Sequence, residues 1–159
     1  MQFDEAFTIL MQHEGHFSDV KADPGGPTKF GVTEAVARNF GYAGDMRDLT
    51  LNVAGAIAHH QYWEPVRADE LPEQIRYAVF DAAYHSGVTQ SVRWLQRAVG
   101  ADADGIIGPN TLAKIAVIKP EVLKSKLLAQ RLKFLTDLPT WNTFGKGWAR
   151  RVSSLLAEA

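Results

Sequence analysis

Apolar side chains recur every three or four residues over most of the chain, which is the pattern of helices that bury one face. The first such stretch is marked by Phe3, Phe7, Leu10 and Met11. Gly15 follows it, and glycine is a common helix terminator. The pattern therefore predicts that Glu14 lies at or just past the end of this first helix, where its side chain can point into a cleft.

The pattern changes over residues 16–32. The segment Asp23-Pro24-Gly25-Gly26-Pro27 is a dense turn signal. It separates two short stretches, Phe17–Val20 and Thr28–Val32. This arrangement predicts a small irregular β-hairpin near the N-terminus, with two or three short strands at most.

From Thr33 onward the helical pattern returns, and capping residues, glycines and prolines divide it into separate helices. The expected helices run from Thr33 to before Gly41, Leu51–Trp63, Pro72 to about Gly87, Thr89–Val99, Asn110–Ala116, Pro120–Leu138 and Phe144–Ala157. The fold class expected from these elements is mainly α, with one small β-hairpin.

Length and composition exclude several classes of protein and of functional site. The chain has 159 residues, of which 46% are apolar and 22% charged, as in ordinary globular proteins. It holds no cysteine, which excludes disulfide scaffolds, thiolate metal sites and thiol nucleophiles. Its apolar runs fall far short of the roughly 20 residues of a membrane-spanning helix. We expect one domain, or one domain with a small appended lobe.

The net charge of −1 conceals an uneven distribution. Residues 1–80 hold 12 acidic and 6 basic side chains, whereas residues 81–159 hold 6 acidic and 11 basic ones. Two interpretations stay open: a basic half that holds an anionic partner, or chance scatter over solvated helix faces. Trp141 and Trp148, with Lys146, Arg150 and Arg151 near them, form a candidate contact surface in the basic half.

The segment from Glu14 to Thr28 carries the candidate chemistry. It holds two carboxylates, on Glu14 and Asp23, and the hydroxyl of Thr28, and its turn can fold the last two back toward the first. Glycosidic cleavage needs two carboxyl groups across a cleft, one protonated and one ionised. The spacing alone also fits a plain alternative, in which Glu14 helps to end a helix and Asp23 is an ordinary turn residue.

Other kinds of site are disfavoured. His13 and His16 are three residues apart, whereas the zinc-binding histidines of metalloproteases are four apart on one helix face. Asp102 and Asp104 resemble the start of a calcium loop, but the later ligands are missing, so a tight turn is expected there. The pI near 6.5 and the lack of a helix-turn-helix pattern argue against nucleic acid. No stable membrane insertion is expected.

Several segments, in order, resemble glycoside hydrolase family 108, the N-acetylmuramidases of phage endolysins and bacterial secretion-activating proteins. The first is Glu14-Gly15-His16-Phe17 followed by residues 23–33. Later ones are Tyr62-Trp63, Phe80-Asp81-Ala82-Ala83 and Ser86-Gly87. Leu95-Gln96 with residues 104–112 resembles the peptidoglycan-binding-like segment of such proteins, and residues 144–148 with Arg151 resemble its tail. The resemblance covers nearly the whole chain.

The resemblance implies a lysozyme-like helical fold and hydrolysis of the β-1,4 bond between N-acetylmuramic acid and N-acetylglucosamine. Glu14 matches the family's catalytic acid. Asp23, assisted by Thr28, is expected to orient the attacking water, which predicts an inverting reaction. No metal or cofactor is implied. A wall-binding module without catalysis and a zinc-dependent wall peptidase remain as alternative hypotheses.

The sequence departs from the family pattern at residues expected to bind substrate. His16 replaces a glycine, Phe17 a tyrosine and His85 an asparagine. Tyr84 and Trp94 are added as candidates because aromatic faces pack on sugar rings. Aromatic residues at helical spacing are more often core residues, and we expect this of Trp63 and Phe80.

The same resemblance predicts the organisation of the chain. We expect residues 1–88 to form the catalytic region and residues 89–159 to form a helical peptidoglycan-binding-like lobe packed on it in one compact globule. The N-terminus lacks the features of a signal peptide. We therefore expect a monomer made in the host cytoplasm that acts on peptidoglycan glycan strands in the periplasm, after holin-type release.

Overall fold

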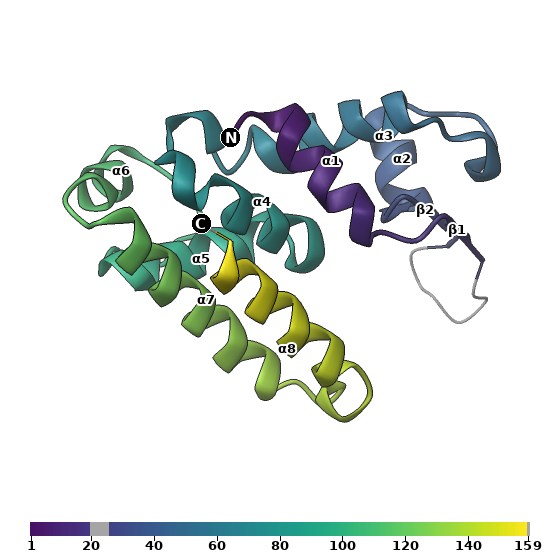
Figure 1. The fold of residues 1–159 in the computed structure, drawn as a ribbon. Coiled ribbons are helices and arrows are strands. Elements are labelled where there is room, and N and C mark those ends of the chain that lie inside the picture. Colours follow the sequence, from purple (N-terminus) through teal and green to yellow (C-terminus); the bar gives the residue numbers. More distant parts are fainter. Residues whose placement is uncertain (20–25, 159) are drawn as a thin grey trace. The chain divides into compact units, whose positions relative to one another are not determined.

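The computed structural model describes residues 1–19 and 26–158. Its contacts divide the chain into two compact units, Gln2–Glu64 and Pro65–Ala159, with Met1 joined to the second. In the part that is described, eight α-helices and one small three-stranded antiparallel sheet make the protein mainly α-helical, which confirms the expected fold class (Figure 1).

The first unit begins with a helix and a small sheet and continues with helices. Its elements are α1 (Phe3–His13), β1 (Phe17–Ser18), β2 (Thr28–Lys29), β3 (Val32–Thr33), α2 (Glu34–Phe40), the 3₁₀ helix η1 (Met46–Asp48), α3 (Leu51–Ala58) and the π-helical turn η2 (His59–Trp63).

Helix α1 ends where the sequence predicts. The backbone N–H of Gln2 donates to the Glu5 carboxylate at 3.0 Å, which satisfies one of the unpaired groups at the start of the helix. Phe7 and Leu10 are buried on its inner face. The helix stops at His13, and Glu14 takes extended backbone angles of −87° and 140°.

The three strands each contain two residues, and their order is β1-β2-β3. Thr28 lies opposite Ser18 on one side and opposite Thr33 on the other. Between β2 and β3 the central turn residues Phe30 and Gly31 have φ values of 54° and 76°. Positive φ at both positions is typical of the tight hairpin turns that suit twisted strands.

Local capping fixes the helices that follow the sheet. The Thr33 hydroxyl accepts a hydrogen bond from the N–H of Val36, and the Thr50 hydroxyl accepts one from the N–H of Val53. The helix expected over Leu51–Trp63 differs after Ala58, where it widens into η2. The N–H of Glu64 donates to the carbonyl of His59, five residues back, at 2.9 Å.

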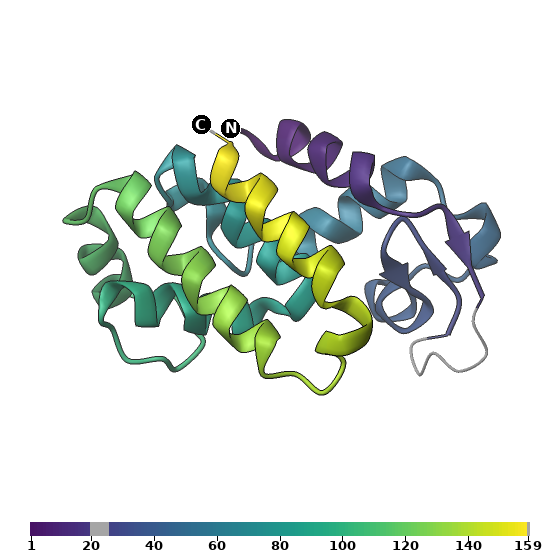
Figure 2. The ribbon, with the colours of Figure 1, turned by 60° about the horizontal axis from the view of Figure 1, so that its bottom comes forward.

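The second unit contains the 3₁₀ helix η3 and five α-helices. They are η3 (Ala68–Glu70), α4 (Glu73–Ser86), α5 (Val88–Val99), α6 (Pro109–Ala116), α7 (Pro120–Thr136) and α8 (Trp141–Ala157). Helix α8 starts three residues before the predicted Phe144, because the chain turns into it directly after Pro139. Figure 2 shows α7 and α8 side by side as an antiparallel pair.

Helix α4 is the central helix of this unit. It packs on α5 and α7, and nearly all its residues from Ile75 to Tyr84 are buried. Because of this packing, the contacts divide the chain at Glu64/Pro65, whereas the expected boundary lies at 88/89. The assignment of catalysis to residues 1–88 and wall binding to residues 89–159 stays a prediction.

The segment between α5 and α6 is a turn built around the buried Gln96. Its amide nitrogen donates to Asp104 Oδ1 at 2.7 Å, to the carbonyl of Ile106 at 3.0 Å and to the hydroxyl of Thr111 at 3.2 Å. Its oxygen accepts from the N–H of Gly105 at 2.9 Å. The tight turn expected at Asp104 is therefore confirmed. No described helix is both long and apolar enough to cross a membrane.

Candidate active site

Glu14 is the first residue beyond α1, and its side chain is half-buried. Gly15 and His16 connect it to β1. The sheet stays near this end of the helix, since the N–H of Phe30 donates to the carbonyl of His16 at 3.3 Å. The candidate acid Glu14 therefore lies at the end of α1, next to the small sheet.

Thr28 and Asp23 were predicted to hold the attacking water. Thr28 lies in β2, is half-buried, and its hydroxyl donates to the carbonyl of Gly26 at 3.5 Å, a long and weak contact. Its hydroxyl therefore retains the capacity to bind water. Asp23 lies outside the described residues, so its predicted role stays a prediction.

His16 and Phe17 are accessible, as the predicted contact with substrate requires. Phe17 is 37% exposed, and the guanidinium of Arg47 lies 5.6 Å from the centre of its ring. His16 is exposed and packs its ring edge-on against Phe30, with centroids 6.3 Å apart. Both side chains come from the segment that directly follows Glu14.

A polar cavity of about 180 Å³ opens beside β1. Its lining residues are Phe17, Asp19, Pro27, Glu34, Arg38, Asp45, Met46 and Arg47. Arg38 is fixed there by Glu34, at 2.7 Å, and by the carbonyls of Tyr42 and Gly44. This mixture of acids, guanidinium groups and one aromatic ring offers the donors and acceptors that a sugar ring needs.

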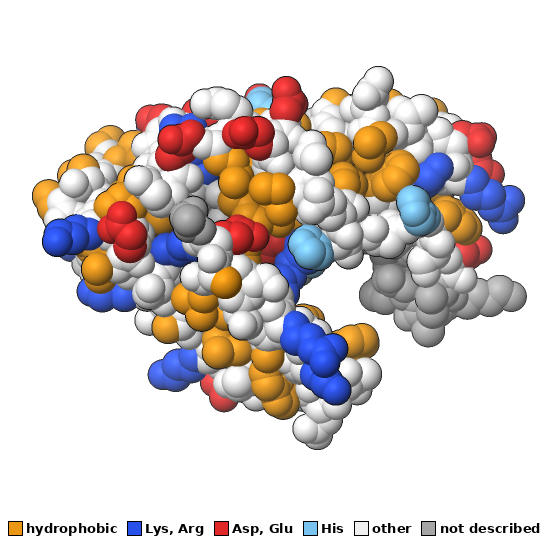
Figure 3. Space-filling model, in the orientation of Figure 1, with side chains coloured by type: hydrophobic (Ala, Val, Ile, Leu, Met, Phe, Trp, Pro, Cys, Tyr) orange, Lys and Arg blue, Asp and Glu red, His pale blue; other side chains and the backbone are white. Residues whose placement is uncertain are grey.

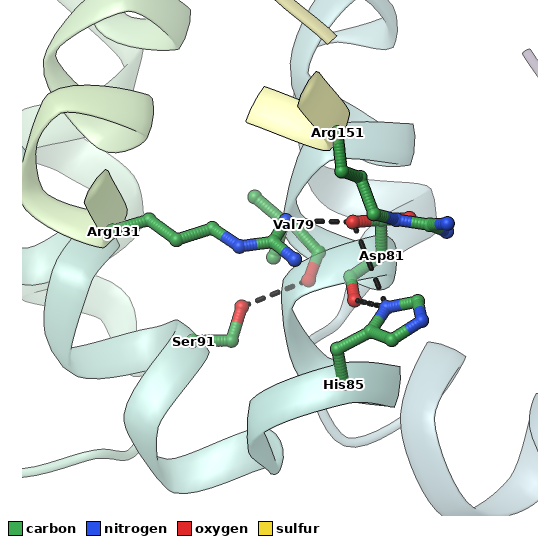
Figure 4. Close-up of polar contacts among 6 residues, drawn as sticks. All are labelled: Val79, Asp81, His85, Ser91, Arg131 and Arg151. Carbon is green, nitrogen blue, oxygen red and sulfur yellow. Dashed lines mark hydrogen bonds and ion pairs between the residues drawn. The ribbon is translucent and has the colours of Figure 1, made fainter. Parts of the chain in front are cut away.

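Asp81, on α4, lies at the centre of a buried charged cluster in the second unit (Figure 4). Arg131 Nη1 donates to Asp81 Oδ2 at 2.6 Å, and Arg151 Nε donates to Oδ1 at 2.8 Å. His85 Nδ1 lies 2.9 Å from the Asp81 carbonyl and 3.7 Å from its carboxylate. Figure 4 shows the second nitrogen of the His85 ring pointing away from Asp81.

The charge on Asp81 is favoured by its partners. Burial opposes this charge and is the largest single effect on the pKa. The hydrogen bond from Arg151 and the positive charges around the carboxylate act the other way and hold the pKa below the ordinary value of 3.8. The carboxylate is therefore ionised at neutral pH.

Asp81 lies in a segment that resembles the family, but no site role is predicted for it from the sequence. The available signal was a charged residue inside the apolar run Phe80–Ala83 of a helix. Burying a charge is costly without partners, so such a residue predicts an ion pair. Arg151 was expected at a contact surface and is instead an internal partner of Asp81.

The two aromatic candidates of the second unit are both buried. Trp94 is 1% exposed and packs edge-on against Phe134, with centroids 5.3 Å apart. It has no open ring face for a sugar, so its predicted stacking role is corrected. Tyr84 is 9% exposed, and its ring contacts Phe80 and His85. Trp63 and Phe80 are fully buried, which confirms their expected structural role.

The two histidines of η2 contact an acidic side chain. His59 Nδ1 and His60 Nδ1 lie 3.2 Å and 3.1 Å from the Glu64 carboxylate. Across the residues that the structure describes, His, Cys, Asp and Glu side chains form no group of three or more that could hold a metal ion.

Comparison with known proteins agrees with this fold. The fold is lysozyme-like, with the candidate acid at the end of the first helix. Residues 7–87 match the model of the family glycosyl hydrolase 108, and residues 90–153 match a predicted peptidoglycan domain. The chain belongs to glycosyl hydrolase family 108. These matches support a role in peptidoglycan hydrolysis or binding.

A solved structure of similar fold is SagA of Brucella abortus. It is 36% identical in sequence, and the match covers 98% of this chain and 91% of that chain, with a TM-score of 0.89. No curated protein sequence matches the chain.

Proposed function

We propose that this protein is an N-acetylmuramidase of the endolysin type. It hydrolyses the β-1,4 bond between N-acetylmuramic acid and N-acetylglucosamine in peptidoglycan. The observation that carries the proposal is the position of Glu14 at the end of α1, within the residues that match glycosyl hydrolase 108.

In the proposed reaction, the Glu14 carboxylic acid gives its proton to the leaving glycosidic oxygen. Asp23, ionised, and the Thr28 hydroxyl hold a water molecule on the opposite face of the sugar. The water attacks the anomeric carbon and loses its proton to Asp23. This arrangement inverts the anomeric configuration and requires the two carboxyl groups to be roughly 6.5–9.5 Å apart.

The substrate is the glycan strand of the wall. His16 and Phe17 lie two and three residues after Glu14 and are exposed, which supports a contact with the sugar next to the scissile bond. His85, which is exposed, is proposed as a further contact, whereas Tyr84 is buried. The proposed site of action is the periplasm, reached from the host cytoplasm after holin-type release, with the protein acting as a monomer.

The test is digestion of purified peptidoglycan by the wild type and by Glu14→Gln, with mass spectrometry of the fragments. Glutamine keeps the shape of the side chain but has no proton to give, so we expect cleavage to fall at least about 100-fold. Glu121→Gln is the matched control, because Glu121 is exposed on α7 and lies outside the proposed site.

The chemical nature of the fragments distinguishes the muramidase from the alternative hypotheses. New reducible muramic acid ends that vanish in Glu14→Gln support the proposal. Free amino ends with sensitivity to chelators would instead identify a zinc-dependent peptidase, and wall binding without fragments would identify a binding module. A product that retains its anomeric configuration would overturn the water-orienting role of Asp23 and Thr28, but not the muramidase activity.

A further inference from the structure

A second cavity, of about 280 Å³, lies in the second unit on helices α5 and α7. Its lining residues are Trp94, Arg97, Gln130, Lys133, Phe134 and Asp137. None of them has a part in the proposed cleavage. All six belong to residues 90–153, which match the predicted peptidoglycan domain.

One wall of this cavity is aromatic. Phe134 is 37% exposed, and its ring packs edge-on against the buried Trp94. Among the described side chains, the indole N–H of Trp94 is one of the few buried polar groups without a hydrogen-bond partner. Buried donors in proteins are nearly always satisfied. The exposed ring of Phe134 therefore offers an apolar surface for the aliphatic part of a ligand.

The other lining residues are polar or charged. Arg97 and Lys133 bring two positive charges, and within the described part of the chain neither side chain forms an ion pair or hydrogen bond. Gln130 and Lys133 lie three residues apart on α7, and Asp137, the residue directly after this helix, follows Lys133 by four. Two unpaired cations beside an amide and an aromatic ring form a surface that is complementary to a carboxylate.

We propose that this cavity binds a carboxylate of the peptidoglycan stem peptides. Arg97 receives the carboxylate through its planar guanidinium, and Lys133 contacts it as a second positive charge. Phe134 packs on the neighbouring aliphatic carbons, and Asp137 takes an ammonium group of the stem peptide. This inference deepens the proposed function, since it names a second part of the wall polymer that the protein holds.

The chemistry favours a peptide carboxylate over the neutral sugars of the strand. A sugar ring offers hydroxyl and amide groups, and these do not neutralise the two cations of Arg97 and Lys133. A nucleic acid is disfavoured because Asp137 places a negative charge in the same cavity.

The test is binding of a disaccharide–tetrapeptide released from the wall to the full-length protein. This fragment no longer contains the bond that a muramidase cleaves, so binding is measured without hydrolysis. Calorimetry gives the affinity, and the nuclear magnetic resonance signal of the Trp94 indole N–H, assigned with Trp94→Phe, reports on the cavity itself. The same fragment with its carboxylates converted to amides is the second ligand.

The variant Arg97→Gln/Lys133→Gln removes both positive charges. We expect it to weaken binding about tenfold or more, since a hydrogen bond to a charged group is worth about that factor. The amidated fragment should bind the wild type as weakly as the parent fragment binds this variant. The control Arg93→Gln/Lys119→Gln removes two exposed positive charges outside the cavity and should change affinity less than about twofold.

An equal loss in both double variants would overturn the proposal, because general charge attraction would then explain the binding. Unchanged binding of the amidated fragment would also overturn it, and this result does not depend on the folding of any variant. Failure of the proposed cleavage is recognised separately, as an inability to cut glycan strands that have been stripped of their peptides.

Discussion

Asp81 of α4 and Arg131 of α7 form an ion pair inside the second unit, with 2.6 Å between Oδ2 and Nη1 and no exposure of the Asp81 side chain. Arg151 of α8 binds the other carboxylate oxygen. One carboxylate therefore connects three helices of this unit. A buried pair is weak evidence of net stabilisation, but the loss of one member leaves charges buried without compensation.

Asp81→Asn should therefore destabilise the protein strongly. Asparagine has nearly the same shape but no charge, so two guanidinium groups lose their counter-charge. We expect the free energy of unfolding to fall by about 3–5 kcal/mol. Urea denaturation at neutral pH measures the change. Asp102→Asn, at an exposed position, is the control and should change stability by less than about 0.5 kcal/mol.

The contribution of Asp81 to the free energy of unfolding should decrease as the pH is lowered. Its partners hold the pKa below 3.8 in the folded protein, against an ordinary value in the unfolded chain. The stabilisation is therefore fully present above about pH 5 and is lost as the pH falls through the folded pKa. Urea denaturation of the wild type and Asp81→Asn from about pH 7 to pH 3 should show a constant difference that shrinks below about pH 4. A difference that grows in acid would contradict this assignment.

The turn between α5 and α6 should depend on Gln96. Its buried amide makes four hydrogen bonds to this turn and to α6, so Gln96→Leu leaves several of these groups unsatisfied. We expect a loss of about 3 kcal/mol in the free energy of unfolding. Hydrogen exchange should show faster exchange at the amides of Gly105 and Ile106. Gln74→Leu, at an exposed position of α4, is the control. Equal exchange in the two variants would show that other contacts hold the turn.

The features predicted best from the sequence are those that depend on residues close together in the chain, such as the ends of helices. Thr33 and Thr50 cap helices because their partners are three residues away, and proline and glycine stops act just as locally. Asp81 could not be assigned in this way, because its partners are 50 and 70 residues distant. Trp94 was misplaced because helical spacing identifies a face of a helix, but not whether that face meets a groove or the core.

The salt dependence of activity tests whether the basic half of the chain binds the anionic wall. Figure 3 shows Lys and Arg side chains on the surface over the α7–α8 pair of the second unit. If this surface holds the anionic wall, hydrolysis of whole peptidoglycan should fall about threefold or more when salt shortens the screening length from about 10 Å to about 3 Å. Hydrolysis of peptide-free glycan strands should change far less. An equal salt effect on both substrates would assign the charge distribution to chance.

Alanine substitutions at two glycines of α8 test how tightly the aromatic residues of this helix pack. A Cβ added at Gly145 would lie 2.7 Å from Cε3 of Trp141 and closer still to two other indole atoms. At Gly147 an added Cβ meets nothing within 4 Å. Both residues lie inside the helix, so alanine should gain about 0.5–1 kcal/mol of helix propensity at either position.

Gly147→Ala should therefore raise the melting temperature. Gly145→Ala should lower it, because overpacking typically costs about 1–3 kcal/mol and the indole of Trp141, which packs against Trp148, must move. Thermal unfolding measures the two signs, and tryptophan fluorescence should change in Gly145→Ala alone. If both variants were stabilised to the same extent, the indole would be free to move aside, and Trp141 would not be held against the helix at Gly145.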